Sequence, residues 1–217
     1  MINLKKLIFG GRSAPADLAP EVGEALAAWR ARPAPAADEA HFHSRYVVVD
    51  LVLAGEAEQS LQGIAAAGLT RGGVIMPDDV MVVGATNDGA AFDRQLAALL
   101  CFAAKAPLVS YRVPFVDGVL RQVYGERLGV DFRPTWIDLA WLLPELFQDV
   151  SATPVAREVW LGAFHVEAPA ERDALTRVLS LAKLMQVALA RAGERGIDTP
   201  ARLAEAAQAR RFLRQNA

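Results

Sequence analysis

The sequence has a single cysteine, Cys101, and only three histidines. One cysteine excludes an internal disulfide and a zinc site built from several cysteines, and it suits a reducing compartment. The chain also lacks a long apolar run. Residues 7–9 are too few for the core of a secretion signal, and no later segment approaches the length of a membrane span. We therefore expect a cytoplasmic protein that makes no membrane contact.

The chain has no strong excess of charge of either sign. Lysine and arginine total 23, aspartate and glutamate total 25, and the formal net charge is -2. This balance gives no overall attraction to nucleic acid, so any such contact has to come from a local group of basic residues. Hydrophobic residues make up 53% of the 217 positions, which is enough for the core of one substantial α/β domain.

The clearest local pattern is an apolar run that contains a single acidic residue, Asp50. Residues 45–55 read RYVVVDLVLAG. An uninterrupted β-branched run predicts a strand covered on both faces, and an acid at the end of such a strand lies where α/β folds place their chemistry. The residue two positions after Asp50, on the same face of the strand, is Val52. No second carboxylate accompanies the first.

The other elements follow in an α/β order. An amphipathic helix runs from Pro20 to about residue 32, and a linker rich in proline and alanine spans 33–40. The pattern then predicts, beyond the strand at Asp50, strands over 60–69, 73–76 and 107–111, helices over 92–104, 116–128 and 172–192, and an extended or helical element at 136–139. Thr199 and Pro200 start a final helix.

These elements predict a mixed sheet of about five strands flanked by helices, with added N- and C-terminal helices. We divide the chain into an N-terminal helix and linker (1–44), an α/β domain (45–192) and a C-terminal helical tail (193–217). The tail combines several arginines with Leu203 and Phe212. Such a helix is a candidate surface for a protein partner, although packing on the domain is its default role.

Three segments within residues 45–192 resemble the motifs of the DEDD superfamily of 3′-to-5′ exonucleases, of the type that includes the epsilon proofreading subunit of DNA polymerase III. Residues 47–50 (VVVD) resemble the first motif, residues 107–111 (PLVSY) with Phe115 the second, and residues 172–175 (RDAL) the third. The resemblance implies a ribonuclease H-like fold. It also implies a site in which four carboxylates hold two divalent metals and a histidine activates water.

Most positions that the resemblance assigns to this site hold other residues here. The first acid falls on Asp50, but the second falls on Val52, which cannot bind a metal. The third falls on Val116, and Asp117 comes one position later. One step along a helix turns a side chain by about 100°, so we expect Asp117 to point out of the site.

The third motif brings positive charge instead of metal ligands. The histidine position falls on Arg172 and the last acid falls on Arg177. A guanidinium in the pocket repels Mg²⁺ and offers Asp50 another partner. We therefore predict an Asp50–Arg177 ion pair in place of the metal centre, and no cofactor. Arg172 and Arg177 are also candidates to bind an anion or nucleic acid, with solvated helix residues as the alternative.

Three functions follow as alternatives. The preferred one is a catalytically inactive exonuclease-like protein that binds nucleic acid or a nucleotide, or serves as an interaction module. In the second, an active divergent exonuclease holds Mg²⁺ or Mn²⁺ with Asp50, Asp117 and Asp173, or with Glu171. In the third, the chain is a structural homo-oligomer or partner-binding protein with no role in nucleic-acid binding.

Other polar residues are weaker candidates. His165 could act as a base but stands alone near a loop. His41 and His43 have strand spacing but no third metal ligand nearby. Asp138, in residues 136–139 (WIDL), falls where the resembled family has a structural acid, so we predict an architectural role for it.

Overall fold

A computed structural model describes residues 18–54, 60–84, 88–167 and 174–215. None of the helices in these residues combines the length and apolar character that a membrane crossing requires. In chain order the elements are α1 (Pro20–Ala31), β1 (Tyr46–Ala54), β2 (Ser60–Thr70), β3 (Val74–Gly84), α2 (Gly89–Ala103), β4 (Leu108–Ser110), α3 (Val113–Leu128), β5 (Trp136–Asp138), α4 (Leu139–Leu146), α5 (Arg157–Ala163), α6 (Ala174–Glu194) and α7 (Pro200–Gln215).

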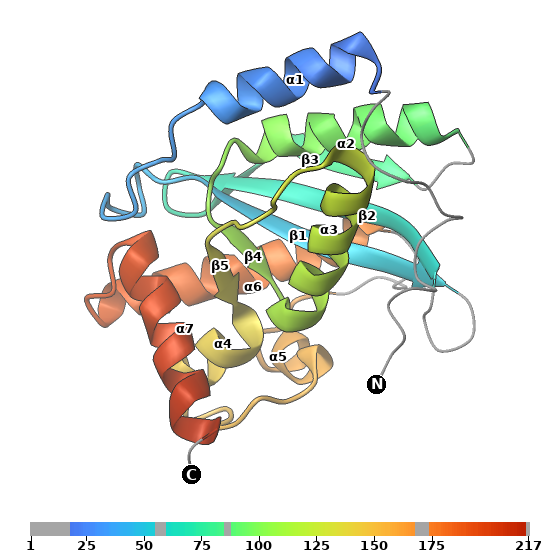
Figure 1. The fold of residues 1–217 in the computed structure, drawn as a ribbon. Helices are drawn as coiled ribbons and strands as arrows, with labels where there is room; N and C mark the ends of the chain where they lie inside the picture. Colours follow the sequence, from blue (N-terminus) through green and yellow to red (C-terminus); the bar gives the residue numbers. More distant parts are fainter. Residues whose placement is uncertain (1–17, 55–59, 85–87, 168–173, 216–217) are drawn as a thin grey trace.

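The strands form one mixed sheet with the order β3-β2-β1-β4-β5. β1 pairs antiparallel with β2, and β2 pairs antiparallel with β3, so these strands form a meander. β4 and β5 extend the sheet in parallel with β1, and α3 makes the crossover between them. The expected α/β class, with a mixed five-stranded sheet between helices, is confirmed (Figure 1).

Alternation along β1 divides its side chains between two cores. Val47, Val49 and Leu51 pack in a core that includes α1, α2 and α3. Val48 packs in the opposite core, to which α4, α5, α6 and α7 contribute. Figure 1 shows these two groups of helices on opposite sides of the sheet. Because side chains alternate along a strand, Asp50 belongs to the face that α6 covers.

The third strand is longer than the sequence pattern predicts. The apolar pattern stops at Met76, where Pro77 and two aspartates follow, yet β3 continues to Gly84. β3 is an edge strand, and its pairing with β2 is irregular between Ile75 and Val80. Pro77 lies in this irregular stretch, where the missing N–H of proline interrupts no ladder hydrogen bond.

The structure defines two parts of the chain that the sequence pattern leaves ambiguous or does not predict. Residues 136–139 contain both predicted alternatives, because β5 ends at Asp138 and α4 begins at Leu139. The sequence pattern does not predict α5, since seven residues are too few to show a helical period. Trp160 anchors this short helix and is fully buried in the second core.

The N- and C-terminal helices both pack on the sheet domain. α1 buries Val22 and Leu26 in the first core. α7 buries Leu203 in the second core, and Arg210 donates a hydrogen bond to the Ala152 carbonyl. The predicted start of α7 is also present, since Thr199 Oγ1 accepts a hydrogen bond from the N–H of residue 202. The tail is therefore a packed helix, although Phe212 is 67% exposed near its end.

Asp138 joins the starts of two helices. Its Oδ1 accepts hydrogen bonds from the backbone N–H of Arg112 and Ala140, both at 3.0 Å, and its Oδ2 accepts one from Val113 at 3.1 Å. Burial raises the pKa of Asp138 above its ordinary value, although the three N–H donors act in the opposite direction. The bonds also tie down Arg112, which has a φ of 59° before α3. The architectural role predicted for Asp138 is confirmed.

The substitution Asp138→Ala tests this role. It leaves three backbone N–H groups at the starts of α3 and α4 without their acceptor, so we expect the free energy of unfolding to fall by about 2–4 kcal/mol. Urea denaturation measures the change. Asp149→Ala is the control, because Asp149 is exposed and a surface change of this kind costs about 0.5 kcal/mol or less. Equal stability of the two variants would contradict the assigned role.

Candidate functional site

The cleft opens where β4 stops pairing with β1. Backbone N–H groups of odd-numbered residues in β1 point toward β4, as the bond from Val47 N to the Pro107 carbonyl shows. β4 ends at Ser110, so Leu51 has no strand partner on that side. Its N–H instead donates to Asp50 Oδ1 at 3.0 Å. Asp50 lies within β1 and not at its end, which corrects the sequence prediction, but it does lie beyond the end of the neighbouring parallel strand.

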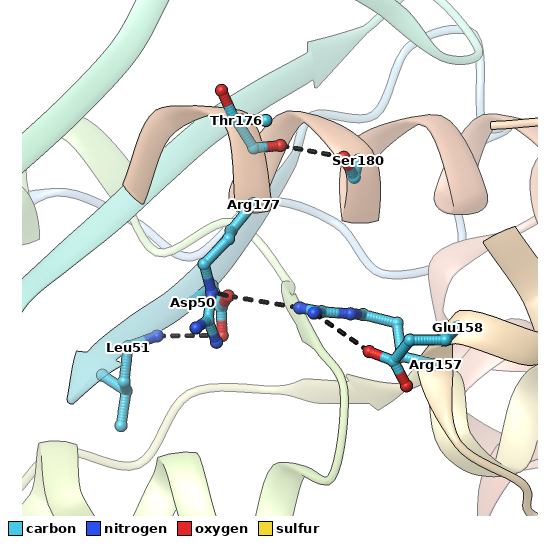
Figure 2. A network of polar contacts seen from close by, with 7 residues as sticks. All are labelled: Asp50, Leu51, Arg157, Glu158, Thr176, Arg177 and Ser180. Atoms are coloured by element: carbon cyan, nitrogen blue, oxygen red, sulfur yellow. Dashed lines mark hydrogen bonds and ion pairs between the residues drawn. The ribbon is translucent and has the colours of Figure 1, made fainter. Parts of the chain in front are cut away.

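Asp50 faces two arginines. Arg177 Nε lies 2.9 Å from Asp50 Oδ2, and Arg157 Nη1 lies 3.8 Å from the same oxygen. The side chains of Asp50 and Arg157 are 13% and 12% exposed, and that of Arg177 is 28% exposed. Figure 2 shows the two guanidinium groups approaching Asp50 from α6 and α5. The predicted Asp50–Arg177 ion pair is confirmed, and the carboxylate is held by cationic side chains in a mostly desolvated place.

Sequence reasoning missed Arg157. It is the first residue of α5 and also pairs with Glu158 Oε1 at 3.1 Å. No motif or spacing connects it with Asp50, because their contact depends on how α5 docks through Trp160. The only sequence signal was an arginine in a segment with no assigned element.

The charged residues that line the cleft give it a local positive charge. The cleft has a volume of about 480 Å³, and its charged lining residues are Asp50, Glu158, Arg112, Arg157 and Arg177. Three cations against two anions give a formal charge of +1, whereas the whole chain carries -2. The cleft is thus a candidate anion site on a protein that does not attract anions as a whole.

The other positions that the first and second motifs assign to the site lie as expected. Val116 is buried and lines the cleft, and Val52 lies on the Asp50 face of β1 without adding a carboxylate. Asp117 is held elsewhere, because its Oδ1 accepts a hydrogen bond from Trp136 Nε1 at 2.7 Å and its Oδ2 pairs with Arg121 at 2.8 Å. This agrees with the expectation that Asp117 points out of the site, and Asp117 is not among the described residues that line the Asp50 cleft. The third-motif candidates Arg172, Asp173 and Glu171 lie outside the described residues.

The donor set around Asp50 does not fit the divalent metals that the resemblance implies. Mg²⁺ and Mn²⁺ prefer several oxygen ligands, whereas Asp50 Oδ2 is engaged by Arg177 and its Oδ1 by a backbone N–H. Within the described ranges, no three histidine, cysteine, aspartate or glutamate residues come close enough to hold a metal ion. The chemistry open to these residues is the binding of an anion, not of a cation.

None of the three histidines lines the cleft within the described part of the chain. Both ring nitrogens of His41 are used, since Nδ1 lies 2.6 Å from the Tyr46 hydroxyl and Nε2 lies 2.9 Å from the Ile197 carbonyl. His43 is exposed beside Phe42, and His165 is exposed with a φ of 51°. The histidines therefore offer neither a metal site nor a base for the cleft.

No protein-family model and no curated protein sequence matches this chain. Function is therefore inferred from the cleft and from the fold around it.

A double-mutant cycle tests the ion pair. Asp50→Asn keeps an acceptor for the Leu51 N–H, and Arg177→Met keeps most of the aliphatic stem. We expect a coupling of about 1–2 kcal/mol in the free energy of unfolding, because both side chains are mostly desolvated. The control cycle uses Asp131 and Arg133, an exposed pair at 2.7 Å for which we expect no measurable coupling. Equal couplings in the two cycles would contradict the burial argument.

His41 predicts a pH dependence of stability. Burial lowers the pKa of His41 below its ordinary value, against the opposing effects of the Ile197 carbonyl and Asp198. The unfolded chain therefore takes up this proton at a higher pH, and stability falls as the pH drops below about 6.5. Denaturation curves between pH 5 and 8 should show a shallower dependence for His41→Gln. His43→Gln is the control and should keep the wild-type slope; an unchanged slope in His41→Gln would refute the prediction.

Proposed function

We propose that this protein is a metal-independent, catalytically inactive relative of the DEDD-type 3′-to-5′ exonucleases that binds single-stranded nucleic acid through a phosphate group in the Asp50 cleft. The strand order supports a ribonuclease H-like arrangement, because an antiparallel meander is followed by two parallel strands. The segments that resemble the first two motifs lie on β1 and on β4 with α3, and Arg177, at the position of the last acid, lies on α6.

The observation that carries this proposal is the contact between Arg177 and Asp50. In a two-metal site, carboxylates gather cations that neutralise the charge of the transferring phosphate. Here a guanidinium takes the cation's place beside the one retained carboxylate. Arginine offers planar pairs of N–H donors to phosphate oxygens, but it supplies no activated water. Such a cleft is suited to bind a phosphodiester without cleaving it.

The same geometry makes Asp50 a competitor of the phosphate. Asp50 Oδ2 lies near both Arg177 and Arg157, so a phosphate that binds these guanidinium groups has to share them with the carboxylate. Removing the negative charge should therefore strengthen binding. In an active nuclease the same carboxylate would hold a metal, and its removal would abolish activity. Replacing Asp50 therefore has opposite effects under the two functions. It strengthens nucleic-acid binding by an inactive protein and abolishes cleavage by an active nuclease.

Fluorescence anisotropy with a short single-stranded DNA tests this proposal. In low salt with EDTA, we expect Asp50→Asn to bind about three- to tenfold more tightly than the wild type, because one like charge beside the phosphate is removed. Arg157→Met should weaken binding and reduce the slope of log affinity against log salt by about 0.7–1. Arg133→Met, which removes an exposed arginine outside the cleft, is the matched control and should change little.

Two results would overturn the proposal. One is the absence of wild-type binding at low salt, and the other is cleavage of DNA or RNA with Mg²⁺ or Mn²⁺ that Asp50→Ala abolishes. The second result would establish the active exonuclease.

A further inference from the structure

A second hollow adjoins the Asp50 cleft. It has a volume of about 450 Å³, and Arg112, Phe115 and Ala156 line both hollows. The two are therefore parts of one groove. The second part lies between the starts of α3 and α4 and the segment before α5.

The lining of the second hollow differs from that of the first. It is largely apolar and aromatic, with Phe115, Trp141 and Pro154 among its residues. Trp141 packs partly against the second core, and its indole N–H has no hydrogen-bond partner among the described residues. An indole in a hollow of this kind offers a flat surface for stacking together with one free donor.

Charge indicates which part of a ligand each hollow suits. The first hollow has a formal charge of +1. In the second, Arg112 is balanced by Asp138, and the helix-start N–H groups are already bonded to that carboxylate. The formal charges that line the second hollow therefore cancel, and its helix-start N–H groups offer no additional anion site. A ligand that spans both hollows would have an anionic part near Arg157 and Arg177 and a flat, uncharged part beside Trp141.

Arg112 stands at the junction of the two hollows. Its side chain is exposed, and its guanidinium has no hydrogen-bond or ion-pair partner in the described part of the chain. Its backbone is held at a φ of 59° and a ψ of 56° by the bond to Asp138. A non-glycine residue in this region carries strain, and such positions cluster at functional sites. Arg112 thus provides a cation between the charged and the neutral part of the groove.

We propose that the second hollow is a nucleobase subsite, in which Trp141 stacks on a base while Arg112 and the Asp50 cleft bind the adjacent phosphates of the same strand. This inference rests on the proposed function and adds to it that base stacking contributes to binding. Stacking on an aromatic side chain is tolerant of sequence because every base has a flat face. We therefore expect recognition of single strands with little preference among bases.

The test compares two ligands of equal charge, a short oligothymidylate and an abasic phosphodiester of the same length. Trp141→Leu removes the stacking surface but keeps an apolar side chain against the core. We expect this variant to bind the oligothymidylate about tenfold more weakly and to bind the abasic strand unchanged. Arg112→Met should weaken both. Phe42→Leu, at an aromatic residue that is 61% exposed outside the groove, is the matched control and should alter neither.

Each outcome decides the inference. A loss confined to the base-bearing strand, together with unchanged thermal unfolding, supports it. If the wild type binds both strands but Trp141→Leu has no effect, or weakens both equally, the base subsite is wrong and phosphate binding by the cleft stands. If the wild type binds neither strand, the proposed function fails and the subsite fails with it.

Discussion

The site depends on the need to neutralise one carboxylate that is largely removed from water. Asp50 is 13% exposed on the face of β1 that α6 covers, and an ionised carboxylate in such a place needs a charged partner or several donors. Arg177 and Arg157 supply the charge, and the Leu51 N–H supplies a donor. These partners come from β1, α5 and α6, so one local requirement joins three elements that lie far apart in the sequence.

The cleft itself is a consequence of sheet geometry. β4 pairs with β1 only at Val47 and Val48, and the chain then turns away toward α3. This leaves the edge of β1 open from Asp50 onward. The turn requires Arg112 to adopt a left-handed backbone, which Asp138 stabilises by accepting N–H groups at the starts of α3 and α4. The same carboxylate that shapes the turn therefore holds the backbone of Arg112 between the two hollows.

The resemblance to metal-dependent exonucleases and the geometry of the cleft lead to the same proposal by separate arguments. In the sequence, Val52 and Val116 occupy positions where the resemblance leads us to expect acids. In the structure, the Arg177 guanidinium lies against Asp50, the one acid that matches the first motif. Apolar residues at positions where acids are expected and an arginine beside Asp50 both disfavour a divalent cation, which is why we propose an anion-binding cleft.

The sequence by itself determined the order of most elements, because runs of β-branched residues and helical spacing are local properties. Through the resemblance, it also indicated that Arg177 would meet Asp50. It determined that Asp117 turns away, since one helical step fixes a direction. Only the tertiary structure decided the length of β3, the existence of α5 and the approach of Arg157. These features depend on an edge position in the sheet and on the docking of Trp160, and neither is encoded in the spacing of neighbouring residues.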